Sequence, residues 1–193
     1  MDLLEEDKEG YQKENDDMQT RAYINKSSPY QKKVDAVRYK YFNSHRKGML
    51  KVLCVGCGVE EPIKVNATHA CDLSALAERF LRSGNWKGEF KVCSCDNLPY
   101  SNKEFDLVIC SEVIEHLPTK KDITKTFNEV NRVGKRWIIT TPWITRAAGN
   151  TEPTHKHFLN EKEITRIVPN LDYFLERRDI FVFARGGIDA EKG

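Results

Sequence analysis

The sequence predicts an α/β fold built on one doubly wound, mostly parallel sheet that ends in an antiparallel hairpin. Short apolar runs alternate along the chain with segments of helical periodicity, which favours right-handed crossovers between parallel strands. The last two apolar runs are only a few residues apart, a spacing that permits only an antiparallel pair. The stretch between Gly58 and Asp72 is too short for a loop, a full helix and a strand, so we expect the first crossover helix to be shortened to about one turn.

The first part of the expected domain begins with a helix and two strands. A turn of two serines and a proline precedes a helix over 30–44, because these residues interrupt regular structure. An apolar strand at 51–55 ends at glycines, and a weaker strand covers 68–71. Apolar residues then recur at helical spacing from Leu73, and Gly84 ends that helix.

The middle of the chain has the clearest elements. Strands are expected at 90–93 and 105–110, the second of which is a continuous apolar run. Thr119 and Asp122 have the spacing of a capping box at a helix start. The helix after them has an apolar stripe formed by Ile123, Phe127, Val130 and Val133. The next strand covers 136–141 and is stopped by a proline.

The end of the chain contributes one helix and the hairpin. Asn160 and Glu163 mark a helix start, and the helix is expected to end before Pro169. Strands at 173–177 and 180–184 then form the antiparallel pair at one edge of the sheet.

Length and composition are those of one globular domain. The chain has 193 residues, of which 39% are hydrophobic and 31% charged, enough to bury a proper core. No apolar run approaches the ~18 residues of a membrane span, and none resembles a signal peptide, so we expect a cytoplasmic protein without a membrane partner. The net charge of +2 neither requires nor excludes nucleic acid.

Two regions are expected along the chain. Residues 1–30 carry many charges and few apolar anchors, which predicts a flexible N-terminal arm. Its second part, 23–30, contains tyrosines and a lysine that could close over a ligand as a lid. Residues 31–193 form the folded domain.

The six cysteines are best explained as packing residues. Cys54 and Cys57 form a C-x-x-C pair, which is also a pattern of zinc and redox sites. No second pair at zinc-finger spacing follows, and most of the cysteines lie in or beside expected buried strands. Free buried thiols behave as small hydrophobic side chains and suit a reducing compartment.

Candidate ligand-binding residues stand where the expected parallel strands end. Gly56 and Gly58 follow the first strand, where glycine lets the backbone turn and approach a ligand. Asp72 ends the second strand. A carboxylate there can accept both hydroxyls of a ribose, or it can cap the helix that begins at Leu73.

The segment 93–118 (CSCDNLPYSNKEFDLVICSEVIEHLP) contains several motifs that together resemble those of a known protein family. Its Leu98-Pro99, Phe105-Asp106 and EVIEHL motifs resemble class I S-adenosylmethionine-dependent methyltransferases, in particular the type 11-like members with EVLEHL. With VLCVGCG before it and RWIITTP after it, the resemblance covers about residues 50–142. It implies a Rossmann-like fold and an enzyme that transfers a methyl group from S-adenosyl-L-methionine to a small-molecule acceptor.

The resemblance also implies roles for individual residues. The cofactor would lie against Gly56, Gly58, Asp72, Leu73, Cys95, Asp96, Asn97, Leu98 and Ser111. His116 and Glu112 would be catalytic, with His116 able to act as a general base. The chain departs from the family pattern at Cys54, where an aspartate is common, and at Glu60, where a third glycine is common. These departures put the depth of the cofactor site in doubt.

Two alternatives remain open at this stage. Glu112, Glu115 and His116 share one face of a helix and resemble the metal-binding segment of small-RNA methyltransferases that modify a 3′-terminal ribose 2′-hydroxyl. His155 or His157 would then complete the metal site, and RNA would be the acceptor. We expect no metal, because the same motif occurs in metal-free relatives. The altered glycine loop also allows a non-catalytic binding protein of the same fold.

Overall fold

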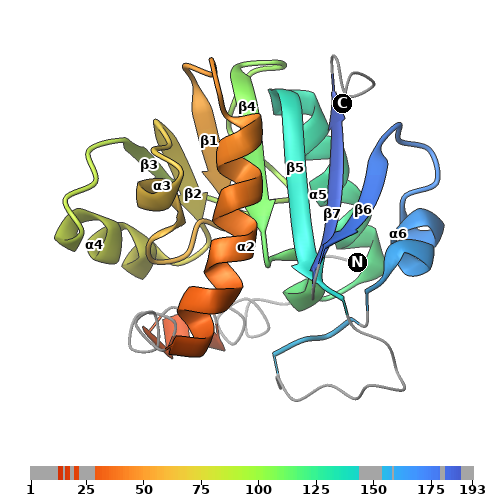
Figure 1. Ribbon diagram of the computed structural model, residues 1–193, viewed down its shortest axis with the longest axis horizontal. Helices are drawn as coiled ribbons and strands as arrows, with labels where there is room; N and C mark the ends of the chain where they lie inside the picture. Colours follow the sequence, from red (N-terminus) through yellow and green to blue (C-terminus); the bar gives the residue numbers. More distant parts are fainter. Residues whose placement is uncertain are drawn as a thin grey trace.

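The computed structural model describes residues 13–14, 16–17, 20–21, 29–143, 154–157, 159–178 and 181–187. It has one seven-stranded sheet with the strand order β3-β2-β1-β4-β5-β7-β6 (Figure 1). The strands are β1 (Val52–Val55), β2 (His69–Asp72), β3 (Glu89–Val92), β4 (Phe105–Ser111), β5 (Gly134–Pro142), β6 (Phe174–Arg178) and β7 (Phe181–Gly187). The helices are α2 (Pro29–His45), α3 (Glu61–Lys64), α4 (Ala75–Ser83), the 3₁₀ turn η1 (Ile114–His116), α5 (Lys120–Val133) and α6 (Glu161–Ile167).

The pairing of the strands confirms the predicted fold class. Strands β3, β2, β1, β4 and β5 are parallel neighbours. Strand β7 pairs antiparallel with β5 and with β6, which completes the C-terminal hairpin. The strand order reverses between β1 and β4, and in open α/β sheets this switch point is where ligands bind, outside the carboxyl ends of the strands.

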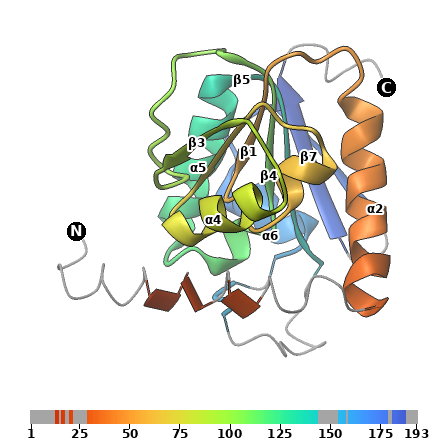
Figure 2. The same ribbon diagram turned by 90° about the vertical axis from the view of Figure 1, so that its left-hand side faces the viewer.

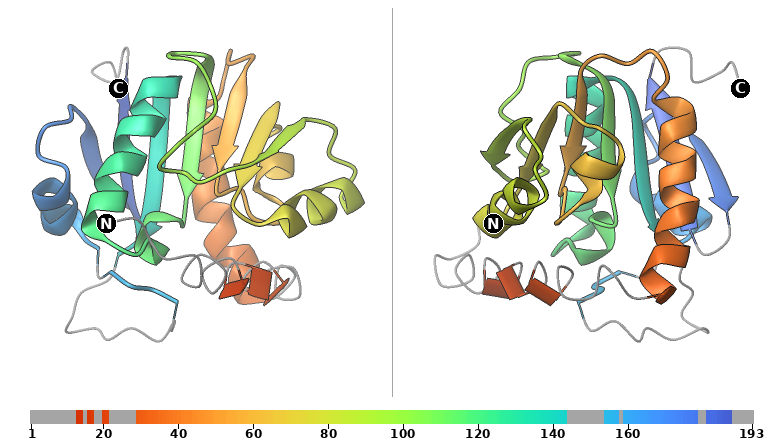
Figure 3. Two further views of the ribbon diagram at one scale, coloured as in Figure 1. Left: turned by 180° about the vertical axis from the view of Figure 1, so that it is seen from behind. Right: turned by 60° about the vertical axis from the view of Figure 1, so that its left-hand side comes forward.

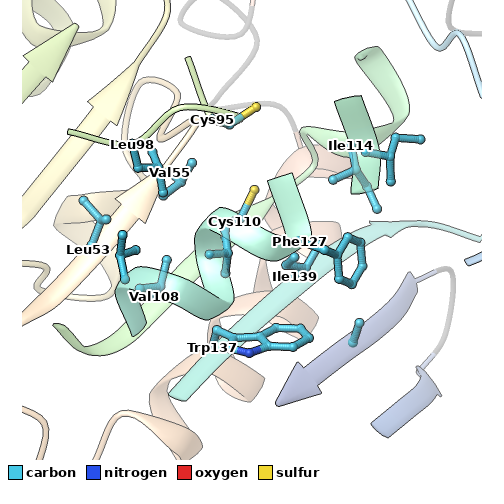
Figure 4. Packing of buried hydrophobic residues seen from close by; sticks show 14 of the residues in the cluster. Leu53, Val55, Cys95, Leu98, Val108, Cys110, Ile114, Phe127, Trp137 and Ile139 are labelled. Atoms are coloured by element: carbon cyan, nitrogen blue, oxygen red, sulfur yellow. The ribbon is translucent and has the colours of Figure 1, made fainter. Parts of the chain in front are cut away.

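Both faces of the sheet are covered, as Figure 2 shows with α2 and α5 on opposite sides. Along β4, Leu107 and Ile109 face a core formed with α2 and α4, whereas Val108 and Cys110 face a core formed with α5 and α6. This alternation follows from the two-residue period of a strand. The second core, in which Phe127 packs near Trp137, is seen from close by in Figure 4.

The first crossover helix is shortened, as predicted. Helix α3 has 4 residues, with a proline in its first turn. Because it is so short, it cannot supply the helix N-terminus that usually points at a bound anion in this fold. A ligand at the loop after β1 would therefore be held mainly by the backbone turn of that loop.

The start of α4 excludes one of the two roles considered for Asp72. The helix begins at Ala75 rather than Leu73, and its N-cap is Ser74, whose hydroxyl accepts from Leu76 N. Asp72 Oδ1 instead accepts from Ser74 N at 3.0 Å. Asp72 is therefore not the helix cap, because the chain needs two more residues to turn from the strand into the helix.

The other predicted helix starts are confirmed. Thr119 is the N-cap of α5 and accepts from Asp122 N. Asn160 is the N-cap of α6, where its side chain accepts from two backbone N–H groups. The apolar stripe of α5 is fully buried. Within the described ranges, no helix has the length and apolar character needed to cross a membrane.

Candidate functional site

The loop after β1 packs closely against the segment that follows β4. Gly56 and Gly58 have φ angles of 60° and 56°, in the left-handed region that glycine adopts without strain. A Cβ on Gly56 would lie 2.3 Å from Cγ2 of Val113. The loop therefore requires glycine at position 56, because any side chain would displace the segment that follows β4.

Asp72 lies beside this loop with its carboxylate held in place. Its Oδ2 accepts from Gly58 N at 3.1 Å, and its Oδ1 accepts from Ser74 N. Burial raises the pKa of Asp72 to about 6, against the lowering effect of these backbone N–H groups. A buried carboxylate fixed at the end of the second strand is suited to accept hydrogen bonds from neighbouring hydroxyls.

The segment that follows β3 supplies an apolar wall. Cys95 and Leu98 are buried, Asp96 is half-buried and Asn97 is exposed. Leu98 N donates to Glu129 Oε2 at 2.8 Å, and Asp96 pairs with Lys125 at 3.2 Å. Leu73, next to Asp72, is half-buried. The structure thus places all of these predicted residues at the carboxyl edge of β2 and β3.

A buried ionic group lies behind Ser111 at the end of β4. Arg38 on α2 donates from Nη1 to Ser111 Oγ at 3.0 Å and from Nη2 to Asp35. Burial lowers the pKa of Arg38, but nearby carboxylates, Glu112 first, raise it by more, so that the guanidinium stays charged. Glu61 is buried close by, and burial raises its pKa to about 8 although Arg38 opposes the shift. Ser111 is therefore fixed in position by α2.

Glu112 occupies an unusual backbone position. Its φ is 58°, which is uncommon for a residue other than glycine and is often found at functional sites. Its Oε1 accepts from Thr140 Oγ1 at 3.1 Å, and its N–H donates to Thr140 O at 3.0 Å. Burial, together with the charge of Glu115, raises the pKa of Glu112 to about 8.

A second group gathers Glu115, His116 and His155, whose ligand atoms all lie within 4.8 Å of one another. His116 Nδ1 lies 3.1 Å from Thr154 O. Because a carbonyl only accepts, Nδ1 carries the proton and Nε2 bears the lone pair of the neutral ring. Burial raises the pKa of Glu115 to about 7.

This arrangement differs from the metal-binding alternative drawn from the sequence, in which Glu112, Glu115 and His116 are completed by His155 or His157. Glu112 is instead hydrogen-bonded to Thr140, and His155 is the later histidine that lies beside Glu115 and His116. His157 lies elsewhere, with its Nε2 2.9 Å from Leu117 O. The 3₁₀ turn η1 replaces the expected α-helical spacing, so the three sequence-adjacent residues do not share one face.

Sequence reasoning missed the residues that support the site from a distance. Arg38, Glu61 and Thr140 contact or surround the predicted ones, but they lie on α2, α3 and β5. The only sequence signal for Arg38 was its charge within the helix expected at 30–44. The six cysteines are all free, and burial raises the pKa of Cys54 and Cys57 well above the ordinary value, as expected of packing residues.

The N-terminal segment reaches this edge of the sheet. Ser74 Oγ donates to Asp16 Oδ1, and Lys156 Nζ pairs with Glu14 Oε2 at 3.0 Å. Figure 3 shows the described residues between 13 and 21 beyond the carboxyl ends of the strands. The proposed lid at 23–30 lies mostly outside the described residues, so its closure stays a prediction.

Comparisons with known proteins agree with this geometry. The model of a methyltransferase domain matches residues 53–137. The probable tRNA methyltransferase 9B of Bos taurus is 32% identical over 99 residues, which are 50% of this chain and 21% of that protein. The chain thus spans less than a quarter of that relative's length.

Two other similar proteins match over more of their length. The ubiquinone biosynthesis O-methyltransferase of Idiomarina loihiensis is 26% identical over 163 residues, 70% of this chain and 67% of that protein. Among solved structures, an S-adenosylmethionine-dependent methyltransferase from Clostridium acetobutylicum has a TM-score of 0.66 at 15% identity. The match covers 87% of this chain and 97% of that one.

Proposed function

The chain belongs to the class I S-adenosylmethionine-dependent methyltransferases, and from this premise we propose that it methylates a hydroxyl group of a small molecule. The observation that carries the proposal is the carboxyl edge of β1, β2 and β4, where the glycine loop, Asp72 and the Glu115–His116 pair converge. The likeness to an O-methyltransferase over 67% of that protein's length supports a hydroxyl acceptor.

The residues at this edge fit the family's cofactor. A Cβ on Gly56 would collide with Val113, so this position carries no side chain, and the bare backbone of the loop can lie against the methionine part of S-adenosylmethionine. The fixed carboxylate of Asp72 is suited to the ribose hydroxyls, and the buried side chains of Cys95 and Leu98 can flank the adenine. Bound there, the cofactor supplies a methyl group on a sulfonium, which is a good leaving group.

His116 and Glu112 are assigned to the acceptor side. The Nε2 lone pair of His116 can accept the proton of the acceptor hydroxyl, because Thr154 holds the proton of the ring on Nδ1. Glu112, fixed by Thr140, borders the same side of the site. Alignment of the acceptor with the methyl group provides the larger part of the rate, since methyl transfer needs little acid–base help.

A second candidate acceptor is tRNA. The relative with 32% identity is named a probable tRNA methyltransferase, and the match covers 50% of this chain. Against this candidate stands the net charge of +2, which gives little of the phosphate attraction on which most RNA binding depends.

Titration calorimetry with S-adenosylhomocysteine and a transfer assay with labelled S-adenosylmethionine test the proposal. We expect binding at micromolar to millimolar concentration, and transfer to one or more members of a panel of phenols and alcohols. Absence of binding at roughly millimolar cofactor would leave only a non-catalytic protein of this fold. Transfer to tRNA together with none to the panel would replace the small molecule by RNA.

The compartment is part of the same proposal. All six cysteines are free and most are buried, a state that reducing compartments maintain. On this ground we assign the protein to the cytoplasm.

A further inference from the structure

The group of Glu115, His116 and His155 has the chemistry of a metal site. One carboxylate and two imidazoles place their ligand atoms within 4.8 Å of one another. We propose that these three residues bind a divalent transition metal of the zinc or cobalt kind, against the sequence-based expectation of no metal. The site stands on its own geometry, whereas its role in catalysis rests on the proposed function.

The strongest observation is the Glu115 carboxylate. Glu115 is completely buried, and among the described residues its Oε1 has no hydrogen-bond partner. The imidazole nitrogen His116 Nε2 lies 3.9 Å from this oxygen, beyond hydrogen-bond distance. A buried carboxylate oxygen without a partner is costly, and a cation between these two atoms would remove that cost.

The surroundings orient the ligands as they are oriented in metal sites. His116 directs Nε2 at Glu115 because its Nδ1–H donates to Thr154 O. The other oxygen of Glu115, Oε2, accepts from Thr141 Oγ1 at 3.1 Å. Metal ligands are commonly held in this way, with the second imidazole nitrogen on a backbone carbonyl and the carboxylate hydrogen-bonded from behind.

The backbone brings His155 to the group. Lys156 N and His157 N both donate to Glu115 O, at 2.8 and 3.2 Å. These bonds attach the segment with His155 to the same turn that carries the other two ligands, and the His116 and His155 rings lie 4.9 Å apart between centroids. Ligand atoms in a tetrahedral zinc site are roughly 3.3 Å apart, so a modest contraction of this group completes the geometry.

The ligand set also selects the class of metal. Two imidazoles disfavour magnesium and calcium, which prefer oxygen ligands, and favour zinc, cobalt and related ions. Three protein ligands leave at least one position for water or substrate oxygen. In the methyl-transfer reaction that position would bind the acceptor hydroxyl, whose proton passes to solvent, and His116 would then be a ligand instead of the proton acceptor.

Metal binding can be measured without activity. The untagged chain is treated with chelator, dialysed, and titrated with zinc chloride by calorimetry and with cobalt chloride by visible absorption. We expect about one equivalent to bind tightly and cobalt to show the absorption of a low-coordinate site. Failure of the wild-type chain to bind either ion overturns the proposal.

Variants locate the site. Glu115→Gln keeps the side-chain volume and His155→Ala removes one imidazole, and each should weaken binding about tenfold or more. His157→Gln is the matched control, since it removes an imidazole from the same segment but keeps a donor for Leu117 O, and its affinity should stay near that of the wild type. Unchanged affinity in both ligand variants contradicts the assignment. Thermal unfolding in chelator checks that each variant is folded.

Titration of the metal-free chain with S-adenosylhomocysteine tests the proposed function separately from the metal site. Cofactor binding without metal binding removes the metal site and leaves the proposed function intact. Metal binding without cofactor binding supports the site and removes the function.

Discussion

Asp72 links the chemistry of the site to pH. Its pKa is raised from 3.8 to about 6 by burial, so the charged form needed to accept two hydroxyls is lost below that pH. The affinity for S-adenosylhomocysteine should therefore fall about tenfold between pH 8 and pH 5. Calorimetry at several pH values measures this fall.

The Asp72→Asn variant is the control for this assignment. It should bind S-adenosylhomocysteine about tenfold or more weakly at pH 8 and show no step near pH 6. The stability of the fold depends on pH in the opposite direction. Because the pKa of Asp72 is raised in the folded chain, this group stabilises the fold below pH 3.8, and the stabilisation is lost as the pH rises through about 6. A variant with the wild-type pH profile would mean that another group titrates.

Substitution of Gly56 tests whether the loop after β1 has room for a side chain. With a φ of 60° and a Cβ position 2.3 Å from Val113, Gly56→Ala should lower the free energy of unfolding by about 2–3 kcal/mol. Gly48 is the matched control. It also has a positive φ, but its Cβ would meet nothing within 4 Å, so Gly48→Ala should cost only about 1 kcal/mol.

Urea unfolding of both glycine variants measures the difference. Adding Val113→Ala to Gly56→Ala should recover part of the loss, because it removes the atom that clashes. Equal losses at the two glycines would show that strain, and not crowding, makes position 56 a glycine.

At the scale of elements, the N-cap of α5 is the clearest local interaction that stabilises a helix. Thr119 Oγ1 accepts from Asp122 N at 3.2 Å and donates to Asp122 Oδ2 at 2.7 Å. Thr119→Ala should therefore lower stability by about 1 kcal/mol. Thr165, an exposed residue inside α6 whose hydroxyl donates to Glu161 O at 2.8 Å, is the control, and its change to Ala should stay within about 0.5 kcal/mol. Similar losses for both threonines in urea unfolding would contradict a capping role.

At the scale of the whole molecule, the N-terminal segment contacts two separate parts of the carboxyl edge. Asp16 meets Ser74 beside Asp72, and Glu14 meets Lys156 beside His155. A ligand between these contacts should order the chain that follows, so saturating S-adenosylhomocysteine should slow hydrogen exchange at residues 23–31. Residues 120–133 of the core helix serve as the internal control. Equal exchange at 23–31 with and without ligand would make the segment only a connector.

The sequence alone determined the sheet and the short first crossover, and it located the candidate cofactor residues at the ends of strands, because these features follow from local patterns. Apolar runs, turn residues and caps act over a few neighbours, and parallel strands bring their carboxyl ends to one edge. The late start of α4 was missed because Asp72 and Ser74 are both good caps, and only the backbone path chooses between them.

Only the tertiary structure decided which side chains meet across elements. Arg38 reaches Ser111 across 73 residues of sequence, and His155 joins Glu115 through backbone bonds from a distant segment. Such contacts depend on how α2 and the segment after β5 pack on the sheet, which no local pattern encodes. The loss of Glu112 from the candidate metal group has the same cause, since a 3₁₀ turn and Thr140 direct Glu112 away.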